Sequence, residues 1–103
     1  NLDSLSALER LWLGNNAIEK IENLGGLSAL EELGLWNNKI KKIQGLKNLK
    51  NLMHLDLSEN RIRKVEGLEN LKNLYFIYLN DNPIDPIEEE KLKGVGKLSW
   101  KNI

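Results

Sequence analysis

The residues of this 103-residue sequence that could carry out covalent chemistry lie in one alternating stretch, His54-Leu55-Asp56-Leu57-Ser58. In an extended strand, positions 54, 56 and 58 face the same side, so a base, an acid and a hydroxyl group stand in a row. A hydrolase built on such residues also needs an enclosed pocket and hydrogen-bond donors for the developing oxyanion. One open strand face provides neither, so the sequence predicts a protein without enzymatic activity.

Metal and cofactor chemistry have little support in the composition. The chain has one histidine and no cysteine, which leaves zinc without a ligand set. The acidic stretch 80–90 carries the oxygen ligands that calcium prefers, but it lacks the spacing and the loop glycine of an EF-hand. We therefore expect no metal and no cofactor, and we interpret Asp85 as the cap of a short helix.

Binding chemistry is better represented, because aromatic residues recur at positions where strands should point outward. Trp12 should lie beside Gly34, and Trp36 beside Gly14, so each indole can cover a glycine. Exposed aromatic side chains next to charged ones are typical of protein-binding hot spots. The candidate protein-binding residues are Arg10, Trp12, Glu32, Trp36, His54, Asp56, Phe76 and Tyr78.

A repeat of 22 residues places these positions. Its columns are Leu8, Leu30, Leu52 and Leu74; Leu11, Leu33, Leu55 and Ile77; Leu13, Leu35, Leu57 and Leu79; Asn16, Asn38, Asn60 and Asn82; and Ile18, Ile40, Ile62 and Ile84. The Leu-x-Leu part alternates with period two and predicts a strand with leucines inward. The asparagines should hydrogen-bond the turn and the next coil, forming a ladder. The spacing of three that follows favours 3₁₀ turns.

The period also predicts the organisation of the chain as one domain over 1–103. It divides into a half repeat 1–7, repeats 8–29, 30–51, 52–73 and 74–94, and a terminal strand 95–103. Strands are expected at about 10–13, 32–35, 54–57, 76–79 and 98–100, and a helix at 86–93 that stops at Gly94. After the helix the pattern returns one residue early, which places Leu98 and Trp100 in the columns of Ile77 and Leu79. One repeat cannot bury its apolar face alone, so the copies should stack into a solenoid.

Segments 18–24, 40–46 and 62–68 resemble the 22-residue class of leucine-rich repeats, and the resemblance covers residues 2–87. Within this class the chain looks most like the leucine-rich regulatory subunit of protein phosphatase 1. Bacterial internalins share the period, but their repeats are rich in threonine, which is absent here. The resemblance implies an α/β solenoid with a curved parallel sheet on the concave face and 3₁₀ turns on the convex face. It also implies a non-enzymatic scaffold that binds a protein partner on the concave face, for example a phosphatase-like or cytoskeletal protein.

Charge and hydropathy limit the other partners. Fifteen basic and fifteen acidic residues give a net charge of zero, which argues against nucleic acid and membrane surfaces. No apolar run approaches the roughly 18 residues of a membrane span. Glu19, Glu22 and Glu66 interleave a basic ridge around Lys42 and Lys64, and we interpret this ridge as a solvated charged surface. The absence of cysteine favours an intracellular location, cytoplasmic or nuclear.

The sequence begins inside a repeat, which has consequences for its N-terminal end. We expect Leu2, Leu5 and Leu8 to leave one end of the core uncovered, in a monomer that frays or associates weakly end to end. The alternative to a binding scaffold is a designed or consensus structural solenoid, or an excised fragment, with no selected ligand. The regular period favours this alternative, and the irregular surface residues argue against it.

Overall fold

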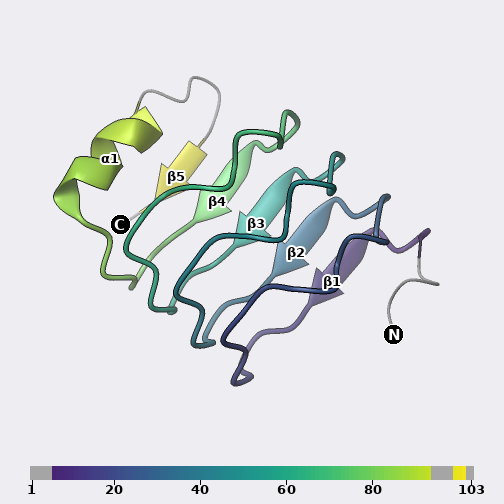
Figure 1. Ribbon diagram of the computed structural model, residues 1–103, viewed down its shortest axis with the longest axis horizontal. Coiled ribbons are helices and arrows are strands. Elements are labelled where there is room, and N and C mark those ends of the chain that lie inside the picture. Colours follow the sequence, from purple (N-terminus) through teal and green to yellow (C-terminus); the bar gives the residue numbers. More distant parts are fainter. Residues whose placement is uncertain (1–5, 94–98, 102–103) are drawn as a thin grey trace.

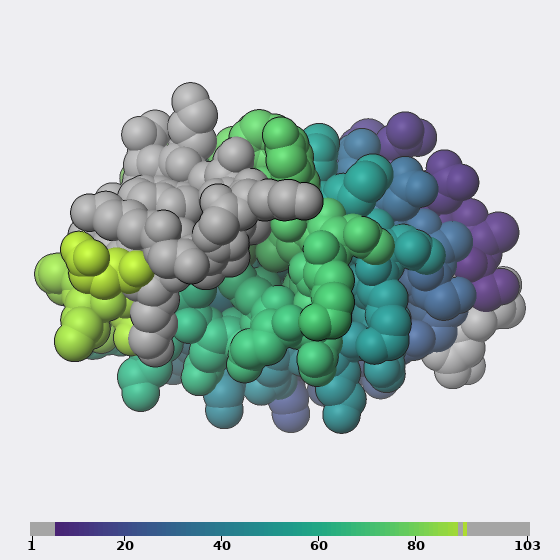
Figure 2. Space-filling model, turned by 90° about the horizontal axis from the view of Figure 1, so that it is seen from above, coloured from purple at the N-terminus to yellow at the C-terminus, as the bar shows by residue number. Residues whose placement is uncertain are grey.

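The computed structural model describes residues 6–93 and 99–101 as a stack of coils, each a short strand followed by a return segment (Figure 1). The strands are β1 (Arg10–Trp12), β2 (Glu32–Gly34), β3 (His54–Asp56), β4 (Phe76–Tyr78) and β5 (Ser99–Lys101), and one helix, α1 (Pro86–Lys93), precedes β5. They form a parallel sheet in the order β1-β2-β3-β4-β5. The return segments cross in front of the strands in Figure 1, so sheet and return segments form opposite faces of a curved solenoid. Successive coils lie side by side along the long axis (Figure 2).

The first four strands begin where the period predicts and end one residue earlier, and the helix has the expected bounds. Each residue of β1, β2 and β3 pairs with the residue 22 positions later on the next strand, for example Leu11 with Leu33 and Leu33 with Leu55. The prediction for the last strand is wrong in register. Ile77 pairs with Trp100, 23 positions later, whereas the sequence placed Leu98 there. The inserted α1 changes the length of the last coil, so the period no longer applies. Leu98 and Gly94 lie outside the described residues.

The inward columns of the repeat form one continuous core between the two faces. Among the described residues, the second and third coils supply most of the fully buried side chains, including Leu30, Leu33, Leu35, Ile40 and Leu55. Full burial of such a side chain stabilises the fold by about 1.5–3 kcal/mol. In the first coil Leu8, Leu11, Leu13 and Ile18 are only half-buried. The expectation for Leu2 and Leu5 lies outside the described residues.

The asparagine column forms the predicted ladder. Asn60 donates through Nδ2 to the carbonyls of Leu57 and Leu35, at 3.0 and 2.9 Å, and its Oδ1 accepts the amide of Ile40 at 3.0 Å. Asn38 and Asn82 make the equivalent bonds, so each joins its own coil to the preceding one. Asn16 is exposed and bonds only carbonyls of its own coil. The side-chain amides thus provide hydrogen-bond partners for buried backbone groups that water does not reach.

The return segments contain fewer turns than the spacing of three suggests. Bonds between residues three apart occur late in each segment, as from Leu49 to Leu46 and from Leu52 to Leu49. The earlier half is held by bonds between coils, such as the Arg61 amide to the Ile40 carbonyl at 2.8 Å. The 3₁₀ turns are therefore local, because the next coil supplies partners that an isolated segment would have to find within itself.

Two positions of the first three repeats take a left-handed backbone, and the fourth repeat keeps only the first of them. The residue before each ladder asparagine has a positive φ, which is 53° at Asn37 and 55° at Glu59. Gly45 takes φ 72°, and a Cβ added there would meet the carbonyl oxygen of Ile21 on the preceding coil at 2.7 Å. Glycine is therefore required at position 45 both by the backbone conformation and by the close approach of the coils.

Helix α1 occupies the return side of the last described coil. Its buried Glu88 reaches the third repeat, where Oε1 accepts the amide of Val65 at 2.8 Å. The cap predicted for Asp85 takes a different form. The Asp85 carbonyl accepts the Glu88 amide at 2.8 Å, while its carboxylate accepts Nη2 of Arg63 at 3.2 Å.

Candidate functional site

Seven of the eight predicted binding residues lie on the strand face in two neighbouring rows, and Trp36 follows β2. The pairing aligns Arg10, Glu32, His54 and Phe76 in one row, and Trp12, Gly34, Asp56 and Tyr78 in the next. Alternation along each strand sends the leucines between these rows into the core. The sheet thus brings together residues that lie 22, 44 and 66 positions apart in the sequence.

Two tryptophans cover the glycines of the sheet, as predicted. A methyl group at Gly14 would overlap the indole of Trp36. At Gly34 it would overlap the same indole and come within 2.7 Å of Cδ1 of Trp12. Trp36 is therefore half-buried, lying flat over backbone that has no side chain of its own. Trp12 is 61% exposed and offers most of its ring to solvent.

Aromatic rings continue across β3 and β4. His54 meets Phe76 edge-on with ring centroids 5.4 Å apart, and Phe76 stacks on Tyr78 at 6.0 Å with 26° between the planes. Tyr75, which sequence reasoning missed, adds an edge-on contact with Phe76 at 5.4 Å and is 52% exposed. The sequence feature that could have identified Tyr75 is an aromatic residue directly before Phe76, the first residue of β4. Such contacts fix the orientation of the rings before any partner arrives.

A hollow of about 160 Å³ lies between these two aromatic groups. Six of the eight predicted residues line it: Trp12, Glu32, Trp36, His54, Asp56 and Tyr78. Arg10 stands beside it and pairs through Nε with Oε2 of Glu32 at 3.4 Å. Phe76 supports it through its ring contacts. The structure therefore gathers all eight residues in or beside one shallow depression, which is lined by aromatic residues together with Glu32 and Asp56.

The row His54, Asp56 and Ser58 does not form a catalytic relay. Ser58 donates through its hydroxyl and its amide to Oδ1 of Asp56, at 2.7 and 3.0 Å. His54 instead packs against Phe76, and in the described part of the chain no hydrogen bond joins it to Asp56 or Ser58. The hydroxyl therefore lacks the neighbouring base that would activate it. Within the same residues, no three His, Cys, Asp or Glu side chains converge in a way that could hold a metal ion.

Family models identify the repeat. A model for two copies of leucine-rich repeats matches residues 6–48, and a leucine-rich repeat model matches residues 28–84, more than half of the chain. The chain belongs to the leucine-rich repeat family. Proteins with leucine-rich repeats generally mediate protein–protein interactions, and the family typically provides non-enzymatic interaction scaffolds. No curated protein matches the chain by sequence.

Solved structures of other leucine-rich repeat proteins share this fold. The internalin inlF of Listeria monocytogenes is 30% identical with a TM-score of 0.83, over 96% of this chain and 29% of its own. Internalin C2 of the same organism is 32% identical with a TM-score of 0.81, over 99% and 45%. A chain of the Drosophila melanogaster SNF/U2A′ complex is 28% identical with a TM-score of 0.76, over 97% and 64%. This leucine-rich repeat chain thus spans less than half of either internalin.

The structure also bears on the membrane prediction. Among the described residues, no helix combines the length and the apolar character needed to cross a bilayer.

Proposed function

We propose that this leucine-rich repeat chain is a non-enzymatic scaffold that binds a protein partner on its concave strand face. The observation that carries the proposal is the hollow between Trp12 and Tyr78, with aromatic walls and the carboxylates of Glu32 and Asp56 beside them. Large exposed aromatic rings rimmed by charged groups are the surfaces on which protein partners gain most of their binding free energy.

Rigidity is the second support for this function. The asparagine ladder and the buried leucines hold the strands in place, while ring contacts and the Arg10–Glu32 pair orient the side chains above them. A partner that binds a preorganised surface loses less binding free energy to the ordering of side chains. The eight predicted residues are therefore the proposed contacts, with Trp12 and Tyr78 as anchors and Tyr75 as an addition at the edge.

The partner itself stays a prediction. A phosphatase-like or cytoskeletal protein follows from the resemblance to the phosphatase regulatory subunit, and the similar chain of the SNF/U2A′ complex belongs to another protein assembly. An intracellular location, the single-domain organisation and the monomeric or weakly associating state are also predictions.

A capture experiment with matched variants tests this function. Trp12→Ala/Tyr78→Ala removes the two exposed anchors, while Ile87→Ala removes an apolar side chain that is 73% exposed on α1, away from the strands. Immobilised wild type and Ile87→Ala should retain the same proteins from a lysate, and the double variant should lose at least one of them. Thermal melting must show that all three proteins are folded. If the double variant retains every protein that the wild type retains, the strand face is not the binding surface, as the alternative of a purely structural solenoid requires.

A further inference from the structure

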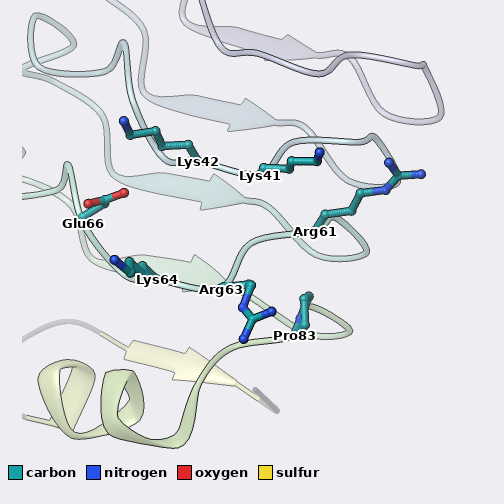
Figure 3. Close-up of a pocket in the computed structure, with 7 residues that line it drawn as sticks. All are labelled: Lys41, Lys42, Arg61, Arg63, Lys64, Glu66 and Pro83. Atoms are coloured by element: carbon teal, nitrogen blue, oxygen red, sulfur yellow. The ribbon is translucent and has the colours of Figure 1, made fainter.

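The face opposite the strands carries a second surface feature, a hollow of about 530 Å³ between neighbouring return segments (Figure 3). We call it the basic hollow. It is lined by Lys41, Lys42, Arg61, Arg63, Lys64, Glu66 and Pro83. Figure 3 shows these side chains on consecutive return segments, Lys41 and Lys42 on one and Arg61, Arg63 and Lys64 on the next. Five cations and one acid therefore border one depression, in a chain whose net charge is zero.

The period of 22 residues causes this concentration of charge. It places Arg63 beside Lys41 and Lys64 beside Lys42 on coils that are about 4.8 Å apart. Like charges on neighbouring coils repel one another, and a bound anion would offset this repulsion. The positions of Lys41 and Arg63 are occupied by Glu19 on the preceding coil and Asp85 on the following one. In this column the basic run is therefore two coils wide and ends in an acid on both sides, whereas the column of Lys42 and Lys64 continues to Lys20 on the preceding coil.

Most of these cations have no counter-ion in the part of the chain that the structure describes. Arg63 pairs with Asp85 at 3.2 Å. Within residues 6–93 and 99–101, Lys41, Lys42, Arg61 and Lys64 take part in no ion pair. Two of the three acids that the sequence interleaves with the ridge, Glu19 and Glu22, belong to the preceding coil and do not line the hollow. The third, Glu66, lines it but forms no ion pair with these cations among the described residues.

The backbone beneath the cations is held in place, which fixes the positions from which their side chains extend. The Arg61 amide bonds the Ile40 carbonyl at 2.8 Å, and the Asp85 amide bonds the Arg63 carbonyl at 3.1 Å. The aliphatic stems of the lysines and arginines, together with Pro83, supply apolar surface between the charged ends. An incoming anion thus meets a cluster of positive charges on a fixed backbone and a partly apolar floor.

We propose that the basic hollow binds a short acidic segment of a protein partner. A guanidinium group can donate two parallel hydrogen bonds to one carboxylate, and the neighbouring lysines add positive charge. A segment that spans two coils would lie among the cations, whereas a longer polyanion would meet Glu19 at one side and Asp85 at the other. Nucleic acid fits less well, because no aromatic side chain lines the hollow to stack on a base. The hollow and the strand face lie on opposite sides, so the scaffold can engage two partners, or two parts of one partner, at once.

A binding measurement with a defined peptide tests the proposal. The probes are a fluorescein-labelled peptide with six consecutive glutamates, its six-glutamine counterpart and a labelled single-stranded RNA, followed by anisotropy at low and physiological salt. We expect the glutamate peptide to bind, the glutamine peptide not to bind, and the affinity to fall with salt. Lys42→Glu/Arg61→Glu should weaken glutamate-peptide binding at least about tenfold. Lys47→Glu/Lys72→Glu has the same net charge but alters exposed lysines outside the hollow, and it should bind like wild type.

Three outcomes would overturn the proposal. The first is no binding of the glutamate peptide at low salt by a folded wild type. The second is equal binding by the two double variants, which would show only a response to net charge. The third is tighter binding of the RNA than of the peptide, where only Lys42→Glu/Arg61→Glu loses the RNA binding. The Trp12→Ala/Tyr78→Ala variant should bind the peptide like wild type, so this test and the strand-face test fail independently.

Discussion

The indole of Trp36 lies across the backbone of Gly14, on the strand face of the preceding coil. The same ring covers Gly34, so one side chain spans two glycines from two repeats. Glycine at these positions is therefore a condition for the flat placement of Trp36, and the flat ring forms one wall of the hollow. The geometry makes position 14, which carries no side chain, a determinant of the candidate binding surface.

Gly14→Ala should displace Trp36, because the new methyl group would overlap its ring. We expect a loss of about 1–3 kcal/mol in the free energy of unfolding, as is usual for overpacking. The indole N–H signal of Trp36 should shift in a ¹H–¹⁵N spectrum, with Trp36→Phe used to assign it. Gly25→Ala is the control, since its Cβ would only reach ordinary contact with Asn48 Nδ2 at 3.7 Å. An unchanged indole signal in Gly14→Ala would show that the ring does not depend on this glycine.

Asn60→Ala should destabilise the fold far more than Asn16→Ala. Asn60 is 7% exposed and satisfies backbone groups of its own coil and of the preceding one, including the Leu35 carbonyl and the Ile40 amide. Each buried group left unpaired costs about 1–3 kcal/mol. Asn16 is exposed and bonds only within its own coil, so its loss should cost less than about 1 kcal/mol. Urea unfolding of both variants gives the comparison, and equal losses would contradict a ladder between coils.

Glu59→Asn should stabilise the chain. Glu59 is exposed and holds φ at 55°, a conformation that asparagine adopts more readily than glutamate. Asparagine already occupies the equivalent positions 15 and 37, where Asn37 Nδ2 donates to Asn15 Oδ1 at 2.6 Å. We expect a gain of about 0.5–1 kcal/mol and a higher melting temperature. Glu59→Gln, which removes the charge but keeps the unfavourable backbone, should not reproduce the gain.

Gly45→Ala should destabilise by about 2 kcal/mol or more, whereas Gly25→Ala should change stability by less than about 0.5 kcal/mol. At position 45 a side chain meets both a positive φ and the carbonyl oxygen of Ile21. Position 25 has neither constraint. Denaturant titration of the two variants measures the difference, and similar midpoints would mean that the coils can separate slightly at no cost.

The spacing of apolar residues and asparagines was sufficient to predict the coils. Residues equivalent to Leu33, Leu35 and Asn38 recur every 22 residues. Because each coil packs against copies of itself, the pattern within one repeat predicts the structure of the whole stack. The sequence therefore predicted where four strands begin, the bounds of α1, the asparagine ladder and the residues that lie on the strand face. The last strand did not, because α1 alters the length of the coil and shifts the pairing of Ile77 to Trp100.

Only the tertiary structure decided which side chains meet. The sequence placed Ser58, Asp56 and His54 in a row, but packing turned His54 towards Phe76 and left Ser58 with Asp56. It also brought Tyr75 to the candidate binding surface. In the basic ridge, two of the three interleaved acids, Glu19 and Glu22, lie outside the hollow, and Glu66 lines it. These relationships depend on rotamers and on contacts between coils, whereas the period specifies only which positions face inward and which face outward.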